Sequence, residues 1–189
     1  MQIRPGPLVY ALGMLAAILA ADFSVAANDG AKSDTSIAFP RTREAFQALT
    51  RDQLESVFEA AERDRIPRAG VYEGKPLYFA GSTFGRIWSN ILSFLIWNGK
   101  VFHSEDGVIY NRLSPFSLEA IKGDIRMGES RRDGKTSVII DYSSTVVGSP
   151  DAGDEIRWMG GDVYLGQGFV RGEPGMFFYL IYKEPLDNS

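Results

Sequence analysis

The densest group of charges in the apolar part of this chain is the segment 154–157, which reads Asp-Glu-Ile-Arg. On a β-strand, alternate side chains point to opposite faces, so Asp154 lies on one face, and Glu155 and Arg157 lie on the other. If one of these faces lines a cavity, a carboxylate beside an arginine could hold a polar ligand or act as an acid or base. The alternative is structural: Arg157 pairs across the sheet with Asp141 or Glu155 and closes one end of the fold.

A second candidate is Asp141, which follows three consecutive β-branched residues, Val138 to Ile140, and precedes Tyr142. Asp141 and Tyr142 could present hydrogen bonds at the mouth of a cavity. The alternative is that Asp141 accepts hydrogen bonds from backbone amides of the loop that follows. If the chain is an enzyme, Asp141, Glu155 and Arg157 are its candidate residues for general acid/base catalysis of the isomerase, cyclase or hydratase type.

Other kinds of chemistry have little support in the sequence. The single histidine, His103, stands beside the turn formed by residues 105–107 and is typical of a solvated hairpin end. The chain has no cysteine, which excludes disulfides, thiolate metal sites and cysteine nucleophiles. No glycine-rich phosphate loop and no Gly-x-Ser-x-Gly nucleophile motif is present. The sequence therefore predicts no metal site and no cofactor.

The start of the chain indicates export. Arg4 precedes an uncharged apolar run over residues 8–21, and small residues follow at 24–27. This pattern predicts a signal peptide over 1–27 and a periplasmic or secreted protein of a bacterial envelope. An uncleaved membrane anchor is the alternative, although the run is shorter than an ordinary membrane span. A net charge of -4 without a basic run argues against nucleic acid as a partner.

Two helical segments are predicted around a set of strands. After a flexible leader at 28–41, an N-terminal helix is expected over 42–66, with a capping box formed by Thr50 and Gln53 and an end at Pro67. Apolar and polar residues at helical spacing predict a second helix over 82–97, inside a barrel domain that spans 67–189.

The rest of the chain alternates short apolar runs with turn dipeptides. This pattern predicts a mainly β fold, an eight-stranded antiparallel up-and-down barrel, because that number of strands encloses side chains or one small ligand and leaves no open edge. The predicted strands are 69–79, 100–104, 108–113, 116–127, 136–142, 154–159, 163–170 and 176–183.

Two short motifs resemble a known family of barrels. Gly70-Val71-Tyr72-Glu73-Gly74 resembles the Gly-x-Trp-x-Gly element of lipocalin-like (calycin) proteins, with Tyr72 in the place of the tryptophan. Trp97-Asn98-Gly99-Lys100-Val101-Phe102 is similar to the Trp-x-Gly-Lys-x-Phe element of the small bacterial proteins named after the first motif. The resemblance implies an up-and-down barrel with an internal apolar cavity. It does not bring haem, since His103 lies at a turn.

The favoured hypothesis is an exported barrel that binds an apolar or amphipathic small molecule and performs no chemistry. The residues expected to line its interior or rim are Tyr72, Trp97, Tyr142, Arg157 and Tyr164. One alternative is the cavity enzyme described above. Another is an envelope protein that contacts the membrane surface, in which the predicted helix at 84–97 lies against lipid. The oligomeric state stays open.

Overall fold

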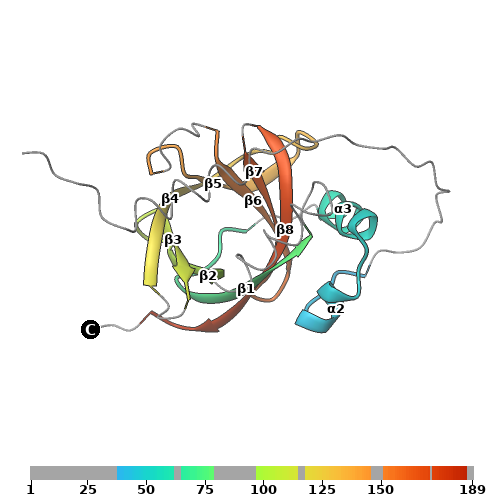
Figure 1. Ribbon diagram of the computed structural model, residues 1–189, viewed down its shortest axis with the longest axis horizontal. Helices are drawn as coiled ribbons and strands as arrows, with labels where there is room; N and C mark the ends of the chain where they lie inside the picture. The colour runs from blue at the N-terminus through green and yellow to red at the C-terminus, as the bar shows by residue number, and fades with distance from the viewer. Residues whose placement is uncertain are drawn as a thin grey trace, which may run out of the picture.

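The chain folds into a closed β-barrel, as predicted. The computed structural model describes residues 38–61, 65–78, 97–114, 118–145, 151–170 and 172–186. Eight antiparallel strands follow one another around the barrel, and the last pairs with the first (Figure 1). They are β1 (Gly70–Tyr78), β2 (Trp97–His103), β3 (Val108–Leu113), β4 (Leu118–Glu129), β5 (Thr136–Asp141), β6 (Gly153–Gly160), β7 (Val163–Val170) and β8 (Glu173–Glu184). Within the described ranges, no strand edge is left open.

The two motifs that carried the resemblance form a single stretch of pairing. Tyr72 of β1 is opposite Lys100 of β2, and Glu73 is opposite Gly99. Gly99 has a φ of 119°, and a Cβ at this position would lie 2.0 Å from the carbonyl oxygen of Tyr72. Only glycine fits so close an approach of two backbones. The glycine of the second motif is therefore required by the first strand.

Two short helices precede the barrel in place of the one helix predicted over 42–66. They are α2 (Arg43–Gln47) and α3 (Arg51–Ala60), and the capping box of Thr50 and Gln53 begins α3 as expected. The predicted end at Pro67 is wrong, because the backbone is already extended at Ala61. Proline sets only the last possible end of a helix, and here the chain leaves the helix earlier.

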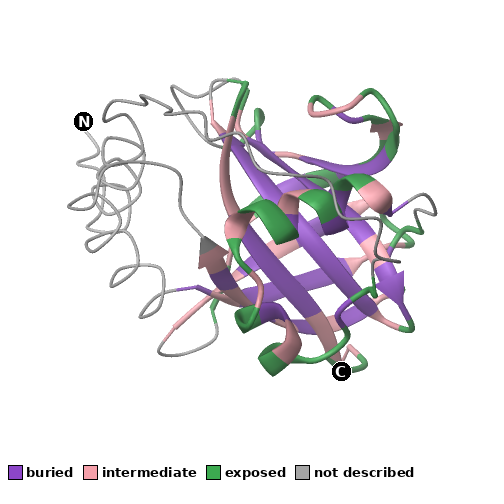
Figure 2. Ribbon diagram, turned by 90° about the vertical axis from the view of Figure 1, so that its right-hand side faces the viewer, coloured by how far each residue is buried: buried purple, intermediate pink, exposed green. Residues whose placement is uncertain are grey.

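The barrel wall has an apolar core on each side. Among the residues that the structure describes, the interior core contains twelve buried ones, including Tyr72, Phe102, Ile156 and Phe178. The outer core lies under the helices, where Phe46 and the buried face of α3 pack on β6, β7 and β8. Figure 2 shows α3 lying across buried strands with its exposed side turned outward. This arrangement explains why β8 is apolar at successive positions: its two faces belong to different cores.

Several predicted segments lie outside the described residues. These are the signal peptide at 1–27, the leader as far as residue 37 and the helix predicted over 82–97 except for its last residue. That residue, Trp97, begins β2, so the helix prediction is wrong at this position. Among the residues that the structure describes, neither α2 nor α3 is long and apolar enough to cross a membrane.

The close approach at Gly99 makes a specific prediction. Gly99→Ala should lower the free energy of unfolding by at least about 2 kcal/mol, because it combines an unfavourable φ with a backbone clash. Gly161→Ala is the matched control, since Gly161 has a φ of 58° but no atom within 4 Å of the added Cβ. That change should cost about 1 kcal/mol. Urea unfolding measures both values, and equal losses would contradict the proposed contact between β1 and β2.

Candidate functional site

Five polar or amphipathic side chains form a hydrogen-bonded group inside the barrel, the interior polar cluster. Its centre is the ammonium of Lys100, which donates to Asn111 Oδ1 at 2.8 Å, to Tyr142 Oη at 2.6 Å and to Asp154 Oδ2 at 2.7 Å. The Tyr142 hydroxyl in turn donates to Asp154 Oδ2 at 2.7 Å. The indole of Trp97 donates to Asn111 Oδ1 at 2.9 Å. The ammonium of Lys100 is thus held by three hydrogen bonds, one of them to its counter-ion Asp154.

The strand alternation explains how these residues come to face inward. Lys100 shares its face of β2 with Phe102, and Asp154 shares its face of β6 with Ile156, both members of the interior core. The ammonium of Lys100 lies 5.2 Å from the centre of the Phe178 ring, within the distance of a cation–π contact. Lys100 is only 2% exposed, so its charge depends on the cluster rather than on water.

The cluster lies toward one end of the barrel. Trp97 is the first residue of β2, Asp154 is the second residue of β6, and Tyr142 directly follows β5. Because the strands alternate in direction, the connections from β1 to β2 and from β5 to β6 join the barrel at this same end. The other two connections at this end run from β3 to β4 and from β7 to β8.

Burial changes the acid–base character of two of these groups. Loss of hydration lowers the pKa of Lys100 from its usual value, although the carboxylate of Asp154 opposes this shift. Burial, reinforced by the charge of Asp154, raises the pKa of Tyr142 well above its usual value. Tyr142 is therefore a neutral hydrogen-bond donor at neutral pH.

One oxygen of the cluster accepts no hydrogen bond from the part of the chain that the structure describes. Asp154 Oδ2 accepts two hydrogen bonds, whereas Oδ1 accepts none from the described residues. The side chain of Asp154 is 10% exposed, against 2% for that of Lys100. On the neighbouring strand, Gly168 is paired with Asp154, and a Cβ there would lie 3.2 Å from Oδ1. Because residue 168 is glycine, no side chain from this position covers the oxygen.

Four of the five predicted lining residues lie in the barrel interior. Trp97 and Tyr142 belong to the polar cluster. Tyr72 and Tyr164 lie elsewhere in the interior core with their ring centres 6.0 Å apart. The Tyr72 hydroxyl donates to the carbonyl of Arg68 at 3.3 Å, while the buried hydroxyl of Tyr164 has no partner among the residues that the structure describes.

The fifth, Arg157, is not a lining residue, because it lies on the outer face of the barrel under α3. Its guanidinium donates to the carbonyl of Phe58 at 2.7 Å and to Asp133 at 2.6 and 2.9 Å. The sequence analysis expected an ion pair of Arg157 with Asp141 or Glu155. The ion pair forms, but its carboxylate is that of Asp133, in the turn between β4 and β5. Arg157 is fully buried, so this pair fastens α3 to the barrel.

The two carboxylates proposed for catalysis form hydrogen bonds with residues that do not belong to the interior polar cluster. Glu155 is on the outer face, where it accepts hydrogen bonds from Ser130 Oγ at 2.6 Å and from the amide of Arg131 at 2.8 Å. Asp141 accepts the amide of Ser143 at 2.8 Å, which confirms the structural alternative and lowers the pKa of its carboxyl. The structure therefore does not bring Asp141, Glu155 and Arg157 together in the interior.

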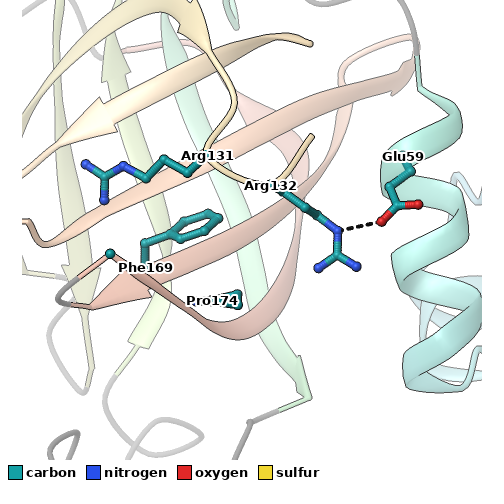
Figure 3. A pocket seen from close by; sticks show the side chains of 6 residues that line it. Glu59, Arg131, Arg132, Phe169 and Pro174 are labelled. Carbon is teal, nitrogen blue, oxygen red and sulfur yellow. Dashed lines mark hydrogen bonds and ion pairs between the residues drawn. The ribbon is translucent and has the colours of Figure 1, made fainter. Parts of the chain in front are cut away.

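The structure also contains an outer groove of about 310 Å³, lined by Glu59, Arg131, Arg132, Phe169, Gly172 and Pro174 (Figure 3). Its Arg132 forms ion pairs with Glu55 at 3.0 Å and with Glu59 at 2.9 Å, and so joins α3 to the β4–β5 turn. Arg131 lies over the ring of Phe169 and donates to the carbonyl of Asp151 at 2.9 Å. The groove thus lies where α3 meets the β4–β5 turn, and both of its arginines already have partners.

Sequence reasoning overlooked Lys100, Asn111 and the separate role of Asp154. The signal was present: each is a polar residue two positions from an apolar residue on the same strand face, namely Phe102, Ile109 or Ile156. His103 packs on Tyr110, and its Nε2 lies 3.8 Å from a carboxylate oxygen of Glu119. Within the described ranges, no three acidic or histidine side chains gather to hold a metal ion.

Comparison with known proteins leaves the family open. No protein-family model and no curated protein matches the chain. A crystal structure of a protein from Thermomonospora curvata is similar, with 21% identity and a TM-score of 0.48 over 72% of this chain and 89% of that one. A similarity of this degree assigns neither family nor function. The closed barrel itself fits the lipocalin-like fold that the motifs predicted.

The ion pair of the interior polar cluster can be tested by a double-mutant cycle. Lys100→Met and Asp154→Leu should each cost about 3–5 kcal/mol in unfolding free energy, because each leaves a buried charge unpaired. The double variant should cost much less than the sum of the two. The same cycle at the exposed pair of Lys183 and Glu184 should show coupling of at most about 1 kcal/mol. Additive losses at Lys100 and Asp154 would contradict the pairing.

The pair that fastens α3 predicts a dependence on acid. Hydrogen bonding from Arg157 lowers the pKa of Asp133 below its usual value of 3.8, so the stabilisation is fully present above pH 3.8 and is lost as the pH falls through the lower, folded-state pKa. Asp133→Asn should cost about 2 kcal/mol at pH 6. Urea unfolding of both proteins should show this difference shrinking toward pH 3. A difference that stays constant would show that Asp133 does not act as an anion here.

Proposed function

We propose that this chain is an exported binding protein whose barrel holds the polar end of an amphipathic small molecule at the interior polar cluster. The observation that carries the proposal is Oδ1 of Asp154, a buried carboxylate oxygen that accepts no hydrogen bond from the described residues and lies toward one end of a mainly apolar interior. Apolar side chains supply most of the affinity in sites of this kind, and a few polar groups orient the ligand.

The cluster is costly to maintain, which supports a functional role. Replacing a buried ion pair by apolar residues of similar size is often neutral or stabilising, so stability alone is a weak reason to keep one. Here Lys100 and Asp154 are joined by Asn111 and Tyr142 in a barrel whose remaining interior is aromatic and aliphatic. A ligand that binds to Asp154 would explain why this buried cluster is retained.

An acid/base enzyme is the second candidate, and the lowered pKa of the buried Lys100, which hydrogen-bonds Tyr142 and Asp154, favours it. Its catalytic residues would be Lys100, Tyr142 and Asp154 rather than the carboxylates first expected. The two functions differ in their dependence on pH: turnover would follow the titration of one of these groups, whereas passive binding of a neutral ligand would change little across neutral pH.

Native mass spectrometry of the protein purified without detergent tests the binding proposal. We expect an additional mass that disappears on denaturation, and we expect Lys100→Met to reduce the occupied fraction at least tenfold. Lys183→Met, a change at an exposed lysine, should leave occupancy unchanged. A wild-type protein that carries no additional mass, and that gains none when incubated with an extract of envelope lipids, would contradict the proposal.

A further inference from the structure

We propose that the ligand of this barrel is an amphipathic alcohol: its hydroxyl donates a hydrogen bond to Asp154 Oδ1, and its apolar part contacts the interior. This inference rests on the function proposed above and specifies the ligand class. It follows from counting the protons and lone pairs of the interior polar cluster that are already in use.

The strong donors of the cluster are committed. An ammonium has three protons, and those of Lys100 go to Asn111, Tyr142 and Asp154. The single proton of Tyr142 goes to Asp154, and that of the Trp97 indole goes to Asn111. Of the two protons on the amide nitrogen of Asn111, one goes to the carbonyl of Ile121 at 3.4 Å. Without breaking one of these bonds, a ligand carboxylate could accept at most the second amide proton of Asn111.

The free position is an acceptor, and Gly168 places no side chain over it. Oδ1 of Asp154 accepts no hydrogen bond from the described residues. Gly168 is paired with Asp154 across β6 and β7, and any other residue there would place a Cβ 3.2 Å from the oxygen. The next atoms to that Cβ position are the side-chain Cγ and the carbonyl oxygen of Met176, each at 3.8 Å. A donor on a ligand therefore meets a carboxylate oxygen beside the side chain and the carbonyl of Met176.

The charge of the ligand's polar group then determines which group binds best beside Asp154. Lys100 already neutralises Asp154 from 2.7 Å, so an ammonium on the ligand would bring a second cation next to the first inside a poorly hydrated interior. A carboxylate would approach the open oxygen of Asp154 with the same sign of charge. A hydroxyl brings no net charge and gains a hydrogen bond to an ionised acceptor, which is stronger than one between neutral groups.

The test is calorimetric titration at pH 7 with decan-1-ol, decanoate and decylammonium, three probes that share one alkyl chain. We expect the alcohol to bind at least tenfold more tightly than either ion. Gly168→Ala should weaken the alcohol at least fivefold, because the added methyl covers Oδ1, and it leaves the hydrogen bonds of the cluster in place.

Asp154→Asn provides a reversal that a purely structural residue would not show. The amide replaces the open acceptor by a donor and removes the counter-charge of Lys100, so decanoate should become the tightest of the three probes. Asp124→Asn, the same change at an exposed position on β4, should leave the wild-type order. Thermal unfolding checks that each variant is folded. If Asp154→Asn does not fold, the comparison of the three probes on Gly168→Ala still tests the proposal.

The outcomes separate the two proposals. Tighter binding of decanoate or decylammonium than of decan-1-ol by the wild type would overturn the alcohol assignment and leave the binding function standing. If the three probes bind equally and Gly168→Ala does not change their affinities, they bind away from Asp154. That result would also overturn the alcohol assignment. If the wild type binds none of them and carries no additional mass in native mass spectrometry, both proposals fail.

Discussion

The interior of this barrel is organised around one contact, the ion pair between Lys100 and Asp154. It joins β2 to β6 across the interior over a sequence separation of 54 residues. Removing either charge would leave the other buried, so the two strands must hold the register that brings them together. Asn111 and Tyr142 complete the shell and add β3 and the end of β5 to the same network. The requirement to satisfy one ammonium thus fixes the position of four strands.

A second buried pair acts on the outer face, and its consequences differ. Arg157 and Asp133 are joined beneath α3, beside the carbonyl of Phe58 at the end of that helix. Neither charge has an open position toward an apolar interior, so this pair explains attachment rather than binding. The alternation of β6 puts Asp154 in one network and Arg157 in the other. The single charged segment 154–157 therefore supports two unrelated tasks.

The sequence predicted the barrel well because its evidence is local. Turn residues and alternating apolar positions recur along the chain, and the strands followed them closely. The candidate site was harder, because it depends on contacts between distant residues. Trp97, Tyr142, Tyr72 and Tyr164 were expected in the interior and lie there, whereas Arg157 was misplaced because a helix covers its side of the wall. Lys100 belongs to the second motif, but its three hydrogen-bond partners come from three other parts of the chain.

If Asp154 Oδ1 receives a ligand hydroxyl inside the barrel, a crystal structure of the protein soaked with decan-1-ol should show that contact. We expect the alcohol oxygen about 2.7 Å from Oδ1, with the alkyl chain against apolar side chains of the interior. An alcohol bound in the outer groove beside Phe169, with Oδ1 bonded to a protein group instead, would refute this mode of binding.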